Sequence, residues 1–251
     1  MNILVCIKRV PLTGAKVKLT EDEQMIDARY LAFGVGPHEE CAIEEAVQIV
    51  KRYGGSATAL TLGSAAAIEQ LRYAAAMGID QLVLLETDEP DWSPMPTARA
   101  IVAAVQAREE PFDVLLFGNE SADSSGYQVA IRVAHALGLP IVTGVKKLAF
   151  ADGVATAQRQ TPLGWEMYKV PLPAVFAVKE GINLPRYPSI PGKLRAKKKV
   201  VERISAEKSP AGLQKIRLVI PELAANQVKI LGVGADAATQ VVELFGELGL
   251  V

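Results

Sequence analysis

The chain has 251 residues, of which 50% are apolar and 22% are charged, and its formal net charge is −1. This composition is typical of a folded protein and excludes wholesale disorder, and the near-neutral charge argues against nucleic-acid binding by the molecule as a whole. Two cysteines and two histidines are too few for a disulfide framework, a structural zinc site or a multi-histidine metal site.

Short apolar runs alternate with longer alanine-rich segments over the first 140 residues. The apolar runs predict buried strands at 3–7, 57–62, 81–86 and 113–117. The alanine-rich segments have helical spacing and predict helices at 37–53, 64–77, 95–108 and 124–137. Strands that alternate with helices are typical of a parallel sheet, and strands without polar alternation indicate that helices cover both faces. We therefore expect a doubly wound, mostly parallel α/β sheet of the Rossmann-like kind.

Two regions depart from this alternation. Residues 8–36 combine turn residues with two apolar patches and predict a long excursion or hairpin after the first strand. After residue 140 the pattern changes to β-strands, with a β-hairpin added to the sheet. These strands are predicted at 141–148, 153–159, 167–170 and 173–178, followed in the tail by a strand at 227–231 and an amphipathic helix at 235–248.

A proline-rich, basic segment begins near residue 181. It has no acidic residue between Gly181 and Val201. Prolines limit the entropy that a segment loses on docking, so we expect an extended arm that contacts a partner. The simpler alternative is that the basic side chains only keep the arm solvated. The cations are Arg186, Lys193, Arg195, Lys197, Lys198 and Lys199.

The chain has no apolar run near the roughly 18 residues that suggest a membrane span. The apolar run at 3–7 is shorter than the core of a signal peptide, and no small-residue cleavage site follows it. We therefore expect a cytoplasmic protein.

The loop at 118–126, with the sequence G-N-E-S-A-D-S-S-G, is the first candidate site. It follows a predicted strand and opens a predicted helix, where open α/β sheets bind ligands and where free N–H groups can hold a phosphate. The simpler alternative is a turn capped by Asp123 or Ser124. Gly63 and Ser64 form a second turn of this kind, in which Ser64 is more simply an N-cap. Neither turn has the dinucleotide fingerprint or the P-loop pattern.

A nucleophilic enzyme site is only weakly indicated. Ser124 and Ser125 lack the G-x-S-x-G pattern of a nucleophile elbow. Both histidines fall in predicted helices, where a packed or surface position is the simpler role, and both cysteines are expected in the core.

Several separated motifs share their order and spacing with one family. They are V-C-I-K-R-V at 5–10, G-P-H with A-I-E-E-A at 36–46, L-R-x-A-A-A-M-G-I-D at 71–80, L-P-A-V at 172–175, N-L-P-R-Y at 183–187 and A-K-K-K at 196–199. On these residues the chain resembles the β subunit of electron transfer flavoprotein. The resemblance covers most of residues 1–200.

The resemblance implies an electron carrier rather than an enzyme. It implies a heterodimer with an α subunit, which makes most of the contacts with the redox FAD. It also implies that electrons pass from acyl-CoA and other dehydrogenases, as in fatty acid β-oxidation, to a quinone oxidoreductase or similar acceptor. It also implies an adenine nucleotide α-hydrolase-like domain at 1–180, a recognition loop and basic segment at 181–200, and an arm at 201–251 that clasps the partner. The domain would bind AMP as a structural nucleotide, or a second FAD in electron-bifurcating members.

The resemblance also assigns residues to these roles. For the nucleotide and flavin it implies Cys6, Ile7, Gly36, His38, Gly63, Gly118, Asn119, Glu120, Ser121, Ala122, Asp123, Ser124, Ser125, Gly126, Tyr127 and Gln128. For partner binding it implies Tyr187, Ile190, Pro191, Lys193 and Leu194, with Ile190 as the apolar anchor.

The chain departs from the family pattern at several of these positions. Gly36 and His38 replace an asparagine and a phenylalanine, and we expect His38 to tune the flavin potential. Glu120 replaces a glutamine, and Ser124-Ser125-Gly126 replaces a sequence that is acidic in the family. The loop therefore leaves two candidates for the bound nucleotide, AMP and a second FAD. Two functions from other classes also stay open: a nucleotide-binding regulatory module, and a nucleotide-hydrolysing enzyme that uses Asp123 and the serines.

Overall fold

The computed structural model describes residues 1–12, 14, 17–90, 92–210, 215–221 and 230–251. The chain forms two compact units. The larger unit contains Met1–Lys18 and Asp27–Lys215, and the smaller unit contains Leu19–Ile26 and Ile216–Val251. The division into 1–180, 181–200 and 201–251 stays a prediction.

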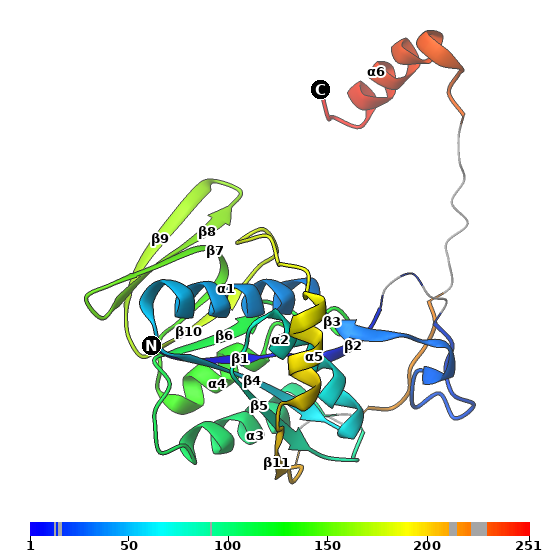
Figure 1. Cartoon of the computed structure of the whole chain (residues 1–251). Helices are drawn as coiled ribbons and strands as arrows, with labels where there is room; N and C mark the ends of the chain where they lie inside the picture. The colour runs from blue at the N-terminus through cyan, green and yellow to red at the C-terminus, as the bar shows by residue number, and fades with distance from the viewer. Residues whose placement is uncertain (13, 15–16, 91, 211–214, 222–229) are drawn as a thin grey trace. The chain divides into compact units, whose positions relative to one another are not determined.

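A single large sheet forms the centre of the larger unit (Figure 1). Within the described residues the strand order is β11–β5–β4–β1–β6–β10–β7–β8–β9, parallel from β11 to β7 and antiparallel from β7 to β9. β10 lies between β6 and β7 although it follows both in the sequence. The strands are β1 (Asn2–Cys6), β4 (Ser56–Gly63), β5 (Gln81–Glu86), β6 (Val114–Gly118), β7 (Ile141–Ala151), β8 (Val154–Thr161), β9 (Gly164–Pro171), β10 (Ala174–Val178) and β11 (Glu202–Ser205).

Helices cover both faces of this sheet, which confirms the doubly wound fold. α1 (Pro37–Tyr53) and α2 (Ile68–Met77) pack on one face, and α3 (Pro94–Gln106) and α4 (Val129–Leu137) pack on the other. Successive residues of a strand point to opposite faces, so β1 contributes to both cores. Its residues Ile3 and Val5 pack with α1 and α2, whereas Leu4 and Cys6 pack with α3 and α4.

The excursion after β1 contains the predicted hairpin pairing. β2 (Arg9–Pro11) runs antiparallel to β3 (Phe33–Val35), with the short helix η1 (Ala28–Tyr30) before β3. The guanidinium of Arg9 lies 3.5 Å above the ring of Phe33, a cation–π contact across the pair.

The start of α4 corrects one prediction. A helix was expected from 124, but α4 begins at Val129. Ser125 and Tyr127 have φ values of 44° and 54°, which lie in the left-handed region and cannot continue a right-handed helix. Residues 119–128 therefore form a loop.

The basic segment corrects a second prediction, because part of the expected extended arm is the helix α5 (Ile190–Lys198). The hydroxyl of Ser189 accepts a hydrogen bond from the backbone N–H of Gly192 at 3.1 Å, and Pro191 occupies the first turn. Figure 1 shows α5 (yellow) beside α2, against which it packs. The edge strand β11 was not predicted at all.

The smaller unit contains an isolated antiparallel bridge between Leu19 and Ile26. It also contains the predicted C-terminal helix, which the structure gives as η3 (Gly234–Asp236) followed by α6 (Ala237–Glu247). The predicted strand at 227–231 has residues 227–229 outside the described residues, and 230–231 are not in a strand. No helix in the described part of the chain is long and apolar enough to cross a membrane.

Candidate functional site

The order of strands in the sheet reverses between β1 and β6. From β1 the chain adds β4 and β5 on one side, and it then places β6 on the other side of β1. Ligands of open α/β sheets bind at the carboxyl ends of the strands beside such a reversal. The ends of β1 and β6 are in register there, with Cys6 opposite Phe117, so Ile7 and Gly118 follow at one edge.

The first turn of α1 packs closely against this edge. A Cβ atom on Gly36 would lie 2.5 Å from Oε2 of Glu39, and a Cβ atom on Gly118 would lie 2.9 Å from Cδ of the same side chain. A Cβ on Gly36 would also lie 3.5 Å from Cβ of Ala122. Gly36, Gly118 and the loop after β6 thus surround one carboxyl group.

The carboxyl group of Glu39 is buried and lacks a partner for one oxygen. Glu39 is 4% exposed, and its Oε2 makes no hydrogen bond to any residue that the structure describes. Burial raises the pKa of Glu39 to about 7, although its own backbone N–H and the cation of Lys8 act in the opposite direction. Near neutral pH this site therefore contains a carboxyl group that is poised to gain or lose a proton.

The loop after β6 is anchored to neighbouring strands by Asn119. Its backbone N–H donates to the carbonyl of Val178 in β10 at 2.8 Å, and its Oδ1 accepts from the N–H of Gly144 in β7 at 2.7 Å. Asn119 thereby fixes the start of the loop against both strands beyond β6.

Further along, the loop is held by its own polar side chains. The hydroxyl oxygens of Ser121 and Ser124 lie 2.8 Å apart, and the N–H of Ser125 donates to the carbonyl of Ser121 at 2.9 Å. Nζ of Lys8 donates to Asp123 at 2.7 Å. Burial would raise the pKa of Asp123, but the hydrogen bond and charge of Lys8 outweigh burial and lower it.

The end of the loop exposes backbone donors. Between Ser125 and Tyr127 the two left-handed residues turn the chain, and within the described residues the N–H groups of Gly126 and Tyr127 form no hydrogen bond. Successive free N–H groups in such a conformation form a concave anion site. Lys8 pairs with Asp123 and thereby offsets the charge of one of the two carboxylates in the loop, the other being Glu120.

His38 and Glu120 lie beside the same edge. Nδ1 of His38 is 4.0 Å from Oε1 of Glu120 and is buried without a hydrogen-bond partner in the described structure. Burial lowers the pKa of His38, although Glu120 opposes this shift. A hydrogen bond to Glu120 also raises the pKa of Tyr127, because the hydroxyl group of Tyr127 donates to the carboxylate of Glu120.

The structure brings most of the predicted nucleotide residues together. Cys6 ends β1 and Ile7 follows it, Gly63 ends the adjacent β4, and the N–H of Ile7 donates to the carbonyl of Leu60 in β4 at 2.9 Å. The loop from Gly118 to Gln128 follows β6 at the same edge of the sheet. The simpler alternative for this loop is wrong, because the residue before α4 is Gln128 and not Asp123 or Ser124. Ser64 precedes η2 (Ala65–Ala67) without a side-chain capping bond.

Sequence reasoning missed Glu39 and Lys8 as members of this site. Glu39 lies in the first turn of α1. Its spacing from Ala42, Ile43 and Ala46 puts it on the buried stripe of α1, and this signal could have found it.

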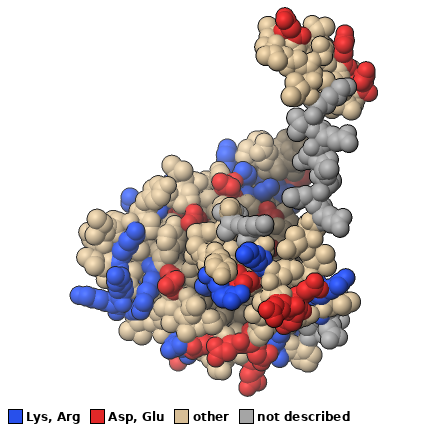
Figure 2. All heavy atoms as spheres, turned by 90° about the vertical axis from the view of Figure 1, so that its right-hand side faces the viewer, with Lys and Arg blue, Asp and Glu red and all other residues tan. Residues whose placement is uncertain are grey.

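The predicted partner-binding residues lie elsewhere, around the start of α5. Tyr187 is 97% exposed and Ile190 is 77% exposed, and Pro191, Lys193 and Leu194 are also on the surface. Figure 2 shows that Lys and Arg side chains are unevenly spread, with a group of them (blue) at the left of that view.

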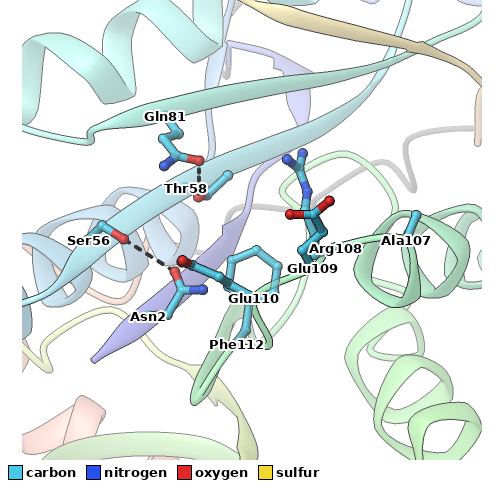
Figure 3. Close-up of a pocket in the computed structure, with 9 residues that line it drawn as sticks. All are labelled: Asn2, Ser56, Thr58, Gln81, Ala107, Arg108, Glu109, Glu110 and Phe112. Atoms are coloured by element: carbon cyan, nitrogen blue, oxygen red, sulfur yellow. Dashed lines mark hydrogen bonds between the residues drawn. The ribbon is translucent and has the colours of Figure 1, made fainter.

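A hollow of about 290 Å³ lies at the opposite, amino edge of the sheet (Figure 3). Its polar side chains pair with one another: Ser56 donates to Asn2 at 3.3 Å, and Thr58 donates to Gln81 at 3.5 Å. None of the described lining residues has a buried polar atom without a partner, so nothing there calls for a ligand. The lining also includes Ala107, Arg108, Glu109, Glu110 and Phe112.

A family model described as "Electron transfer flavoprotein domain" matches residues 26–209. The chain belongs to the electron transfer flavoprotein family. Within that family it is similar to proteins named electron transfer flavoprotein subunit beta, which confirms the resemblance stated from the motifs. The protein from Bacillus subtilis is 35% identical over 208 residues, which are 82% of this chain and 80% of the relative.

Two further flavoprotein β subunits extend this similarity. The protein from Syntrophomonas wolfei is 32% identical over 244 residues, which are 97% of this chain and 95% of the relative. The mitochondrial protein from Oryza sativa subsp. indica is 31% identical over 211 residues, covering 82% of this chain and 83% of the relative. The similarity therefore spans nearly the whole chain in one relative and more than four fifths in the others.

Proposed function

We propose that the chain is the β subunit of a heterodimeric electron transfer flavoprotein, which carries electrons and is not a stand-alone enzyme. Membership of the family carries this proposal. The partner is an α subunit that binds the redox FAD, and the complex passes electrons from acyl-CoA and other dehydrogenases to a quinone oxidoreductase or similar acceptor. We place the complex in the cytoplasm.

The loop from Gly118 to Gln128 would hold an adenine nucleotide, with AMP as the first candidate. The free N–H groups of Gly126 and Tyr127 fit a phosphate, and the Lys8–Asp123 pair keeps the loop in place while it offsets the charge of Asp123. Cys6, Ile7, Gly36 and Gly63 would line the remainder of this site.

His38 would face the flavin that the α subunit contributes. When bound, the flavin supplies the ability to accept and release electrons. The chain's own part is to enclose that cofactor, exclude water from it and set its electrostatic surroundings through His38 and Glu120.

The nucleotide content of the complex tests this function. The chain is co-purified with its α subunit and denatured, and the released nucleotides are identified by mass spectrometry with their stoichiometry. One FAD and one AMP per complex support the proposal. Two FAD without AMP would replace it by an electron-bifurcating form, and a complex without flavin would overturn it.

A variant links the nucleotide to the loop. A Cβ on Gly126 meets nothing within 4 Å, so we expect Gly126→Val to preserve the fold while it adds bulk beside the free N–H groups. We expect this variant to lose the nucleotide and to retain FAD. Gln81→Ala, in the hollow at the opposite edge, is the matched control and retains both.

A further inference from the structure

Four apolar side chains protrude from α5 and from the segment that leads into it. They form what we call the apolar row: Leu184, Tyr187, Ile190 and Leu194, which are 89%, 97%, 77% and 58% exposed. Clusters of exposed apolar side chains of this size usually become buried in an interface when the protein binds its partner. Residues 184–189, where the row begins, have no helix or strand to hold them.

An ion pair with α1 fixes this segment. Nε of Arg186 donates to Oε2 of Glu44 at 2.7 Å, and its Nη2 donates to Oε1 at 2.8 Å. The backbone N–H of Arg186 also donates to Oε2 of Glu44, at 3.3 Å. Both the side chain and the main chain of Arg186 are thus bound to one carboxylate, which sets the path of the chain at this residue.

Glu44 is a buried carboxylate, with a side chain only 4% exposed. Burial would raise the pKa of Glu44, but hydrogen bonds from Arg186 and Gln48 outweigh burial and lower it. The same carboxylate raises the pKa of Arg186. Glu44 therefore stays ionised at neutral pH and needs its partner, because an unpaired charge at this depth is strongly unfavourable.

The two ends of the segment are also tied down. On one side, Nδ2 of Asn183 donates to Oε2 of Glu45 at 2.9 Å and to the carbonyl of Cys41 at 3.0 Å. On the other side, Gly192 packs so closely on α2 that a Cβ there would lie 2.7 Å from the carbonyl oxygen of Ala76. The ion pair lies between these two anchors.

We propose that the Glu44–Arg186 ion pair is a positioning device that pre-orders the apolar row for docking onto a redox partner protein. This inference rests on the proposed function. A bidentate guanidinium–carboxylate pair fixes direction as well as distance, whereas an apolar contact allows sliding. Ordering the row in the free protein removes an entropy loss that would otherwise weaken docking.

The surroundings of the row define the chemistry of the partner surface. Lys193, Arg195 and Lys197 of α5 are exposed beside it, and α5 contains no acidic residue. A partner that fits offers an apolar pocket for the row with carboxylates around it. Glu44 and Arg186 act through the row and need not touch this partner themselves.

The test uses the complete complex with its α subunit and a purified acyl-CoA dehydrogenase as electron donor. We expect Arg186→Gln to raise the KM for the complex about tenfold, while kcat and flavin content stay within about twofold. Backbone amides of 184–189 should exchange with deuterium faster in this variant. Arg108→Gln breaks an ion pair with Glu202 at 2.8 Å on another part of the fold and should change none of these.

A double variant separates positioning from folding. Arg186→Gln leaves Glu44 buried and unpaired, so it is accompanied by the combined variant Glu44→Met and Arg186→Met, which replaces the pair by apolar side chains of similar length. The double variant should fold, retain flavin and still show the raised KM.

Two outcomes would overturn the proposal in different ways. If Ile190→Ala raises KM but the Arg186 and double variants do not, docking by the row stands and positioning by the ion pair is wrong. If none of the three variants raises KM, the assignment of this segment to docking within the proposed function fails as well.

Discussion

Glu39 in the first turn of α1 and Gly118 at the end of β6 lie so close that a methyl group on Gly118 would sit 2.9 Å from Cδ of Glu39. The carboxyl side chain occupies the space that any other residue at 118 would need. Because Glu39 is buried, it cannot swing away into solvent. The helix and the strand end are therefore fixed to one another at the edge where the nucleotide is proposed to bind.

Gly118→Ala should consequently destabilise the protein by about 1–3 kcal/mol, the usual range for overpacking a buried site. The free energy of unfolding, measured with urea, gives the difference. Gly126→Ala is the matched control in the same loop, since a Cβ there has open space, and it should change stability by less than about 0.5 kcal/mol. Equal stability of both variants would contradict the close contact.

Glu39→Gln should change how stability depends on pH. The pKa of Glu39 is raised from 4.5 to about 7 in the folded protein, so between these values the unfolded chain ionises Glu39 while the folded chain keeps it protonated. The contribution of Glu39 to the free energy of unfolding is therefore greatest at low pH and falls by about 3 kcal/mol in total as the pH rises through this range. Glutamine has no such titration.

The difference between the two proteins is the measurement. Unfolding by urea, at a fixed nucleotide concentration, should show the stability of Glu39→Gln rising relative to that of the parent from pH 5 to about pH 7, with the difference levelling off towards pH 8. A difference that is the same at both ends of this interval would show that Glu39 keeps an ordinary pKa.

Ile190→Ala should slow electron transfer from a dehydrogenase and leave flavin content intact. The side chain is 77% exposed, so its removal creates no cavity in the free protein, while it deletes one of the four members of the apolar row. We expect a rise in KM of about tenfold or more. Ile131→Ala, an exposed isoleucine on α4, serves as control. Loss of flavin together with activity would instead indicate a role in assembly.

His38→Phe should alter the flavin midpoint potential only at acidic pH. Burial lowers the pKa of His38, so the imidazole is neutral at neutral pH and acquires its charge below the ordinary value of 6.5. A positive charge favours the more negative, reduced flavin, so the parent should have the higher potential there. Spectroelectrochemistry at several pH values measures this, with the exposed His135→Phe as control. Identical potentials at every pH would exclude the role of His38.

Much of the fold was predictable because the central strands are buried on both faces. β1, β4, β5 and β6 lie within one residue or so of the predicted runs, since continuous apolar sequence leaves few alternatives. β11 could not be found this way. Its sequence E-R-I-S contains one apolar residue and pairs only at the edge of the sheet, so its stability comes from β5 and not from its own pattern.

Local backbone conformation explains the other differences. Ser125 and Tyr127 have a left-handed backbone conformation although neither is glycine, so their identity did not predict that α4 begins later than residue 124. In contrast, α5 had a signal that was overlooked: Ser189 as N-cap with Pro191 just after it is a typical helix start. The prolines and cations of that segment had suggested extended chain.

For the candidate site, sequence predicted the loop but not the group at its centre. The edge location of Gly118–Gln128 followed from the order of strands and helices. That Glu39 is wedged between two glycines depends on the distance between α1 and β6, which only tertiary packing sets. The same holds for the reach of Lys8 to Asp123 across more than a hundred residues.

The position of β10 has a consequence for how the protein is made. β10 is inserted between β6 and β7, and the β8–β9 hairpin intervenes in the sequence. While the ribosome is still adding residues before 174, the edges of β6 and β7 that face each other have no strand to pair with. Such edges invite wrong pairing in a half-made chain. Chaperone dependence during synthesis should therefore peak before Ala174–Val178 emerges and decline once this strand closes the gap.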